Sequence, residues 1–319
     1  MEWKNGDYNL VVEDWIPVVF DDGTFRKVGI WEALVLAGRI RRIAASNPLD
    51  NASLFRFLLA ILYWCRPEIT REELDMLQGA SGVPAEWLER LGTPDSPSPH
   101  FNLLGDGPRF FQTPGLKGKE KKAAGYLLTD LPTETSIAHF RHVRDGEYGI
   151  CPACCAMGMI RFCSFAHGSG RGYSPGINGA APTYVFAETA SLLDAFRRYW
   201  TPGVPLLREP PWINPKSPGS FEEIDIPTLM AWRPRSVWLG KPDDHPIEEC
   251  SYCGEKGRLV RKIGFSRGWK PPARKNERPD DPHLVGISPA GKAKKSLSLP
   301  HPIRSPMESV ASFWRYSLA

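Results

Sequence analysis

The chain has 319 residues and a formal net charge of +4, and 42% of its residues are hydrophobic. This length is enough for one large domain or two ordinary ones with a sizeable core. The 31 prolines and 29 glycines indicate many turns and loops, so we expect an irregular α+β chain rather than a helical bundle. The mild basic bias permits nucleic-acid binding but does not prove it.

The N-terminal part is predicted to begin with a β-hairpin. Residues 9–20 are rich in β-branched and aromatic side chains, and the turn Asp21-Asp22-Gly23 separates them from a second short strand over 25–28. Residues 30–43 are predicted to be a helix, because basic side chains occupy the last turns, where they suit the helix dipole. Apolar residues then recur with the helical period over 51–64.

Shorter elements are predicted to follow. Thr70 and Glu73 form a capping box that opens one short helix, and 84–91 resembles another turn or two of helix. Residues 127–148 show no clear periodicity and are interpreted as a long functional loop. A short helix is expected after Cys154, ending near Phe162.

The C-terminal half combines one helix with strands. Residues 188–200 are predicted to be an amphipathic helix, and 201–219 a proline-rich loop. Residues 228–239 have strand character around a proline, and 258–265 resemble a further strand. No repeat or boundary divides the chain, so we expect a single domain over 1–319, whose metal-clamped core covers about 125–290.

Four of the seven cysteines lie in two C-x-x-C motifs almost a hundred residues apart: Cys151, Cys154, Cys250 and Cys253. Four thiolates complete a tetrahedral structural zinc site, and paired C-x-x-C motifs are typical of such sites. Two disulfides and four unrelated core cysteines are the alternatives. An odd cysteine count without a secretory segment, and with no apolar run of roughly 18 residues, predicts a cytoplasmic protein without a membrane partner.

Two segments beside the cysteine motifs could bind nucleic acid. Gly168 lies 14 residues after Cys154 in a glycine-rich segment over 166–182, where a bare backbone allows close approach to a ligand. Arg267 lies 14 residues after Cys253 at the start of a basic run that contains Trp269. A shared zinc would bring both segments into one neighbourhood. The alternatives are an ordinary surface loop and a solvated charged face.

Hydrolytic chemistry finds no support in the sequence. There is no H-E-x-x-H, G-x-S-x-G or paired-carboxylate motif, and the pair His139 and His142 is interpreted as incidental. A zinc ion with four cysteine ligands has no open position for water. We therefore expect a protein without a catalytic site.

Several segments together resemble the CasA family, the large subunit of the type I-E CRISPR surveillance complex Cascade. They are NLVVEDWIPV near the start, RFFQTPG at 109–115, CPAC followed by the glycine-rich segment, and CSYCGEKGRL followed by basic residues. Each motif is weak alone, but their order over about 8–290 is fairly specific. The resemblance implies a non-catalytic subunit that recognises the protospacer-adjacent motif (PAM) and helps initiate R-loop formation in antiviral defence.

The resemblance also implies roles for individual residues. The four cysteines would bind structural Zn²⁺. A loop before the first motif would contact the CRISPR RNA (crRNA) 5′ end and neighbouring subunits, through Phe140, Arg141 and His142. Gly168, Gly170 and Gly172 match the loop that approaches the PAM duplex from the minor groove, although Arg171 stands where a glycine is expected. Arg267 or Lys270 would supply a basic finger in that groove. Minor-groove readout is permissive, and guide pairing reads the remaining sequence.

The resemblance also implies partners, and the chain differs from the family pattern at one place. The partners would be crRNA, target double-stranded DNA, the backbone, 5′-handle-binding and small subunits, and a helicase-nuclease or a nuclease fused to another subunit. Family members continue into a wedge and a C-terminal helical bundle, whereas this chain stops at Ala319 without a convincing wedge. A free-standing zinc-ribbon DNA-binding protein is the alternative function, and a metal-dependent nuclease a weaker one.

Overall fold

The computed structural model describes residues 8–128, 148–168, 172–179, 182–242, 247–272 and 281–284. The α-helices in these ranges are α1 (Ile30–Val35), α2 (Pro48–Cys65), α3 (Arg71–Met76), α4 (Pro152–Phe165), α5 (Leu192–Tyr199) and α6 (Ile226–Met230). The strands are β1 (Ile16–Phe20), β2 (Phe25–Val28), β3 (Ile40–Ile43), β4 (Gly92–Thr93), β5 (Ser96–Pro97), β6 (Lys122–Ala123), β7 (Arg235–Leu239), β8 (Glu248–Glu249), β9 (Lys256–Gly257) and β10 (Lys262–Arg267). This mixture of helices and short sheets confirms the predicted α+β class.

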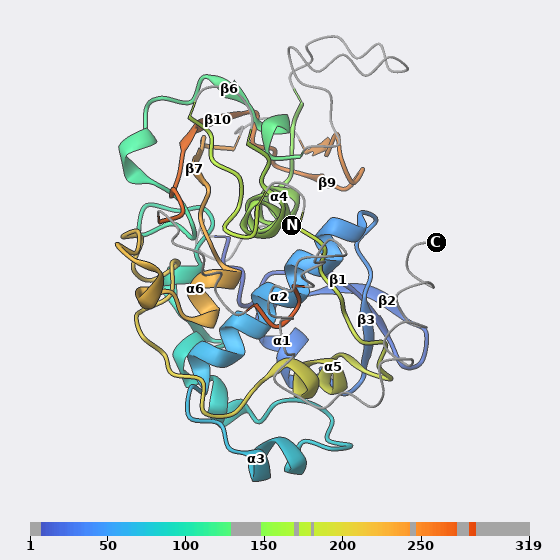
Figure 1. Cartoon of the computed structure of the whole chain (residues 1–319). Helices are drawn as coiled ribbons and strands as arrows, with labels where there is room; N and C mark the ends of the chain where they lie inside the picture. The colour runs from blue at the N-terminus through green and yellow to red at the C-terminus, as the bar shows by residue number, and fades with distance from the viewer. Residues whose placement is uncertain are drawn as a thin grey trace, which may run out of the picture.

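Helix α2 is the centre of the fold. It crosses the middle of the molecule, with the sheet of β1 to β3 on one side and α6 on the other (Figure 1). Asn47 caps its N-terminus by accepting a hydrogen bond from the Leu49 amide, and Pro48 follows at the first helical position. Every residue from Ser53 to Trp64 is buried, so α2 packs on all sides, including against α4 and α6.

The N-terminal sheet has the strand order β2-β1-β3, with both pairings antiparallel. The predicted hairpin is confirmed, but its first strand is shorter than expected. Residues 10–15 leave the strand because the Asn9 side chain accepts a hydrogen bond from the Val11 amide and forms a turn.

The predicted helix over 30–43 is wrong in its second half. The helix ends after Val35, and Ile40–Ile43 instead forms β3, which pairs with β1. Gly38 breaks the helix at a point where the chain passes so close to Ala80 that a Cβ atom would lie 2.0 Å from its carbonyl oxygen. The free edge of β1 then supplies the hydrogen-bond partners that make the following residues a strand.

The second sheet has the order β6-β10-β7, again with antiparallel pairings. The prediction of strand character over 228–239 is only half right. Asp225 caps α6 by accepting a hydrogen bond from the Thr228 amide, so the first residues of that range are helical and β7 begins after Pro234. The strand expected over 258–265 lies slightly later, as β10.

The remaining helices follow local signals. The capping box of Thr70 and Glu73 is present at the start of α3, as predicted. Residues 85–91 form a 3-10 helix, and 201–219 contain neither helix nor strand. Helix α5 buries the apolar face expected of it but begins only after the Ser191 cap, and α4 begins at Pro152 and therefore includes Cys154.

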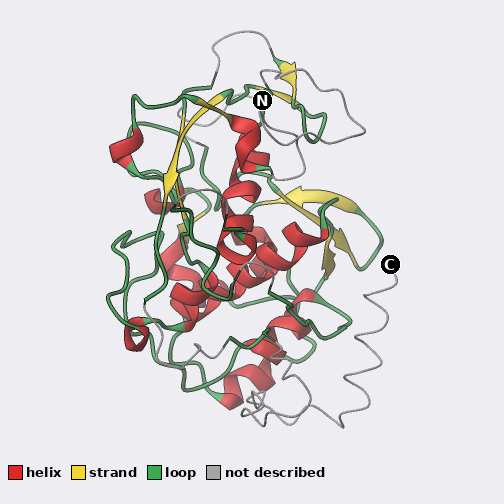
Figure 2. Cartoon of the chain, turned by 45° about the horizontal axis from the view of Figure 1, so that its top comes forward, coloured by secondary structure: helices red, strands yellow, loops and turns green. Residues whose placement is uncertain are grey.

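Several helices lie in the middle of the molecule, whereas strands lie towards its periphery (Figure 2). A single large apolar core includes residues from both sheets as well as from α1, α2, α4 and α5. Within the described ranges, no helix is both long and apolar enough to cross a membrane.

Candidate functional site

The four cysteines of the two C-x-x-C motifs lie together, and we call them the cysteine cluster (Cys151, Cys154, Cys250 and Cys253). Their sulfur atoms all lie within 4.8 Å of one another, and the Sγ atoms of Cys151 and Cys253 are 3.7 Å apart. A tetrahedral ion with metal–sulfur bonds of about 2.3 Å needs sulfurs about 3.8 Å apart. All seven cysteines are free thiols, which contradicts the disulfide alternative. The cluster could hold one metal ion.

Two different local structures deliver the four sulfurs. Cys151 immediately precedes α4, and Cys154 lies in the first turn of that helix. Cys250 and Cys253 lie in the turn between β8 and β9, where Gly254 has a positive φ of 77° and its amide donates to the Cys250 carbonyl. The paired backbone hydrogen bonds between Ile150 and Val260, of 3.0 and 2.9 Å, join the two halves beside the sulfurs.

The ionisation of the cysteine cluster favours a cation. Contact with the Cys151 sulfur raises the pKa of the Cys154 thiol and lowers the pKa of Cys250. The four groups therefore share protons when no ion is present, since four thiolates this close repel one another. A divalent cation removes that repulsion and allows all four sulfurs to be thiolates.

Charged residues connect the cysteine cluster to the rest of the fold. Glu255, two residues after Cys253, forms an ion pair of 2.5 Å with Lys27 on β2. Tyr252, between the two cysteines of the second motif, accepts a hydrogen bond of 3.1 Å from Arg161 on α4. Arg161 also donates two bonds of 2.6 Å to Asp50 on α2, and both of these side chains are buried. The cluster is thereby attached to the first sheet and to the central helix.

The glycine segment (residues 166–182) and the basic run meet, as the sequence predicts. Gly172 has a positive φ of 86°, and a Cβ atom on it would lie 2.3 Å from Cζ of Arg267. The guanidinium therefore lies directly against the bare backbone of the segment, where a side chain would displace it. Gly168 is exposed and folds back towards Pro175 and the Tyr173 carbonyl. Arg267 is the last residue of β10, which pairs with β7, so the contact depends on this sheet and not on the cysteine cluster itself.

Arg267 and Lys270 are both exposed near the end of β10. Trp269 differs from what its place in the basic run indicates. Its ring packs edge-on against the buried Trp232, with centroids 5.1 Å apart, and its Nε1 donates to the Pro215 carbonyl. Trp269 thus packs against a small apolar cluster that includes Trp232 and Leu229.

Several predicted site residues fall outside the described ranges, so their placement is not tested. These are Gly170 and Arg171 of the glycine segment and Phe140, Arg141 and His142 of the loop before the first cysteine motif.

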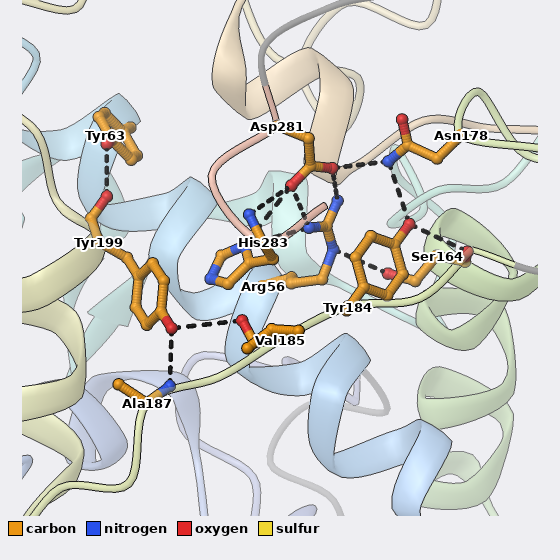
Figure 3. Close-up of polar contacts among 10 residues, drawn as sticks. All are labelled: Arg56, Tyr63, Ser164, Asn178, Tyr184, Val185, Ala187, Tyr199, Asp281 and His283. Carbon is orange, nitrogen blue, oxygen red and sulfur yellow. Dashed lines mark hydrogen bonds and ion pairs between the residues drawn. The ribbon is translucent and has the colours of Figure 1, made fainter. Parts of the chain in front are cut away.

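A buried polar network that the motifs do not indicate lies in the core. We call it the Arg56 network (Arg56, Ser164, Asn178, Tyr184, Asp281 and His283; Figure 3). Arg56 of α2 forms two hydrogen bonds of 2.7 Å with Asp281, and neither side chain is exposed to solvent. Asp281 also accepts a 2.6 Å bond from Asn178 of the glycine segment. The Tyr184 ring covers the guanidinium, with its centroid 4.1 Å from Cζ.

His283 completes the Arg56 network. Burial lowers the pKa of its imidazole to about 4, so the ring is neutral at pH 7. Because Arg56 Nη1 can only donate, His283 Nδ1 accepts its 3.1 Å bond, which places the ring proton on Nε2. Nε2 is buried without a hydrogen-bond partner among the described residues, and the ring packs against Phe186 and Tyr199, with centroids 4.8 and 4.3 Å away. The neighbouring Arg56 charge and these aromatic rings keep the imidazole neutral.

The sequence carries one signal for this network. Arg56 is the single charged residue between Asn51 and Cys65, and the residues from Leu54 to Leu62 are otherwise apolar. A buried arginine needs a carboxylate partner, so one arginine inside an apolar stretch of helix predicts an ion pair. Nothing local identifies Asp281, 225 residues later, as that partner.

Comparisons with known proteins agree on one family. The sequence profile of the CRISPR-associated protein Cse1 family matches residues 9–319. CasA/Cse1 of Thermus thermophilus is 32% identical over 133 residues, which are 41% of this chain and 22% of that protein.

Solved structures share the fold. Thermus thermophilus CasA matches with a TM-score of 0.67 at 23% identity, over 97% of this chain and 61% of that one. Thermobifida fusca Cse1 matches with a TM-score of 0.66 at 18% identity, over 89% of this chain and 56% of that one. A chain of a CRISPR RNA-guided surveillance complex, in a pre-nicking state, matches with a TM-score of 0.67 at 14% identity, over 91% of this chain and 60% of its own length.

This chain thus spans little more than half the length of these structures. The family profile nevertheless covers nearly all of it, and the matched folds extend over most of the described residues. The chain belongs to the CRISPR-associated Cse1 (CasA) family.

Proposed function

We propose that this chain is a PAM-recognition subunit of a type I-E CRISPR RNA-guided complex. It binds target double-stranded DNA through the minor groove, and it helps to start strand separation for R-loop formation. Family membership supports the proposed place of the chain in an RNA-guided complex, since one matched chain belongs to a CRISPR RNA-guided surveillance complex. The contact of Gly172 with the Arg267 guanidinium is the observation that carries the proposed DNA site.

The chemistry of this contact suits a duplex. A glycine backbone can approach base edges where side chains would collide, and the adjacent exposed Arg267 and Lys270 supply positive charge for the phosphates. Backbone amides and one cation in the minor groove distinguish mainly A·T from G·C pairs, so the readout is permissive. Guide RNA pairing then supplies the sequence specificity.

In this proposal the cysteine cluster holds structural Zn²⁺. The all-sulfur ligand set and the spacing of its sulfurs fit that ion, which prefers four tetrahedral thiolates. Bound zinc would add folding energy to a part of the chain whose strands, β8 and β9, are very short. The residues beside it, not the metal, would contact nucleic acid.

The proposed subunit is non-catalytic. Within the described residues, the cysteine cluster is the one group of three or more potential ligands that could hold a metal. Four cysteine ligands fill a zinc coordination shell, so no position remains for a reactive water. We further propose that residues 1–319 form one domain whose metal-clamped core covers about 125–290. Phe140, Arg141 and His142 would contact the crRNA 5′ end and the neighbouring subunits.

Duplex binding by the assembled complex tests this proposal. A duplex with an intact PAM should bind more tightly than one with a scrambled PAM, and equal affinity would contradict PAM recognition. Replacing Arg267 and Lys270 by alanine should weaken binding and flatten its salt dependence by about one unit of slope for each phosphate that is no longer neutralised. Unchanged binding would mean that the basic run is only a solvated face.

Purification distinguishes the alternatives. A Cse1 subunit should copurify with crRNA and partner subunits when these are coexpressed, whereas a free-standing zinc-ribbon DNA-binding protein should not. A metal-dependent nuclease would cleave DNA as the isolated chain after addition of divalent ions. We expect no cleavage under those conditions.

A further inference from the structure

One arginine that no motif indicates binds the glycine segment at two described residues, His167 and Ser174. Arg235, the first residue of β7, is only 6% exposed. Its Nη1 donates to the carbonyl oxygen of Ser174 at 2.8 Å, and its Nη2 donates to the carbonyl oxygen of His167. A third bond, of 2.8 Å, goes to the Pro234 carbonyl. One guanidinium therefore joins His167 and Ser174 to the start of β7.

Aromatic rings shield these hydrogen bonds from water. The centroid of the Tyr173 ring lies 5.0 Å from Cζ of Arg235, and that of the Phe162 ring of α4 lies 5.8 Å from it. Tyr173 also stacks on Phe265 of β10, with ring centroids 6.0 Å apart. Because hydrogen bonds strengthen where water is excluded, the guanidinium holds the two carbonyls more firmly than an exposed arginine would.

Arg235 is also placed opposite the arginine that meets the glycine segment. Arg235 and Arg267 are directly paired across the antiparallel β7–β10 ladder. Like charges at directly opposed positions destabilise a sheet, so other contacts must offset the repulsion between the two guanidinium groups. Burial lowers the pKa of the Arg235 guanidinium, and part of the compensation comes from the Tyr173 ring, over which the guanidinium lies. The backbone carbonyls of the glycine segment supply the remaining compensation.

We propose that Arg235 is a positioning residue, which holds the backbone at His167 and Ser174 and thereby sets Gly172 against Arg267. This inference rests on the proposed function and deepens it, because Arg235 acts through the DNA-facing residues without touching DNA. Lysine cannot replace it. An ammonium on a flexible stem lacks the planar fork that reaches two carbonyls at once.

Arg235→Lys is the test variant, and Arg233→Lys is a matched control. Arg233 is also 6% exposed, and it donates to the Phe111 carbonyl and the Thr113 hydroxyl instead of the glycine segment. Amide hydrogen exchange of a peptide covering 167–179 is measured in the purified full-length chain. Exchange should be about tenfold faster in Arg235→Lys and unchanged in Arg233→Lys. Equal exchange in the two variants would overturn the inference.

Binding by the assembled complex supplies the second readout. Arg235→Lys should reduce the ratio of intact-PAM to scrambled-PAM affinity by about tenfold, with crRNA loading unchanged. An unchanged ratio despite faster exchange would overturn the positioning role. If the wild-type complex shows no PAM preference, the proposed function fails, and the exchange result still decides whether Arg235 holds the segment. Tyr173→Leu, which keeps the guanidinium and removes one covering ring, is a second variant and should show an intermediate increase in exchange.

Discussion

The cysteine cluster and the Arg56 network both join parts of the chain that lie far apart in sequence, but their chemistry is opposite. The cysteine cluster joins the start of α4 to a turn almost a hundred residues later. The Arg56 network joins α2 to Asp281 and the glycine segment through one buried ion pair. The first could hold a metal ion from outside, whereas the second contains both of its charges. Under the proposed function, the same task of holding loops on a helical core is done once by metal coordination and once by ion pairing.

A metal site and a buried ion pair differ in whether apolar side chains can replace them. A structural metal contributes folding energy directly, and no apolar side chain substitutes for a missing ligand. A buried ion pair carries a large desolvation cost, so its net contribution is small even though removal of one partner is severe. The comparison therefore predicts different responses to single and double substitutions.

Cys154→Ser should have the largest effect. Loss of one ligand should reduce bound metal from one ion per chain to a small fraction and lower the free energy of unfolding by roughly 5 kcal/mol. Elemental analysis and thermal unfolding measure the two effects. Cys155→Ala is the control, because Cys155 is equally buried but lies outside the cysteine cluster, and it should retain the metal. Wild-type chain that unfolds at the same temperature with and without a chelator would contradict this prediction.

Arg56→Met should come next, with a loss of about 3–5 kcal/mol in the free energy of unfolding, because it leaves Asp281 buried without its partner. The double variant Arg56→Met/Asp281→Leu should recover most of this loss. Urea denaturation measures both. Such recovery would separate the Arg56 network from the cysteine cluster, which no apolar pair can replace.

A surface pair provides the reference for that measurement. Arg26 and Glu32 form an ion pair whose side chains are 42% and 34% exposed. Arg26→Met should cost less than about 1 kcal/mol, since water screens exposed pairs. If Arg56→Met cost no more than Arg26→Met, burial would not be the source of its effect.

Acidification should weaken the Arg56 network through His283. Burial, opposed in part by the Asp281 carboxylate, lowers the folded-state pKa of His283 from 6.5 to about 4. Protons therefore bind the unfolded chain first, and the stability present above pH 6.5 is lost as the pH falls from 6.5 towards 4. Between pH 7 and pH 5 this loss amounts to about 2 kcal/mol.

His283→Asn removes the titrating ring and keeps an acceptor where Nδ1 meets Arg56 Nη1. The variant, compared with wild type at saturating metal, should lack this part of the pH dependence. Unfolding free energies at pH 7, 6 and 5 measure the difference, and parallel curves for the two proteins would contradict it.

The comparison also explains what the sequence could predict. Zinc ligands on one turn must converge on one ion, so their spacing is local and the C-x-x-C pairs identify the cysteine cluster. A single helix is predicted over residues 30–43 because β3 depends on the distant edge of β1, not on its own residues. Asp281 is likewise indistinguishable from a surface aspartate until the fold brings it to Arg56. Local capping signals, such as Thr70 with Glu73, are correctly predicted because both residues lie within one helical turn. The distant pairings join residues far apart in sequence, so no local pattern indicates them.

Arg235 illustrates the same limit within the proposed DNA site. The glycine segment and the basic run are visible in the sequence, and the structure brings Gly172 and Arg267 together. The residue that holds the segment comes from a strand whose position depends on the pairing of β7 with β10. Its bonds go to backbone carbonyls, which leave no pattern in the sequence.

Tyr252→Phe should have a small effect and tests the hydrogen bond that connects the buried Arg161–Asp50 ion pair to the cysteine cluster. The Tyr252 hydroxyl accepts a bond of 3.1 Å from Arg161, which also binds Asp50 of α2. Its loss should cost about 1 kcal/mol with the metal still bound. A double-mutant cycle with Arg161→Met measures the coupling, which should be of similar size. Additive effects would mean that the turn carrying Cys250 and Cys253 and the ion pair stabilise the fold independently, whereas the coupling expected here makes α2 the common anchor of both.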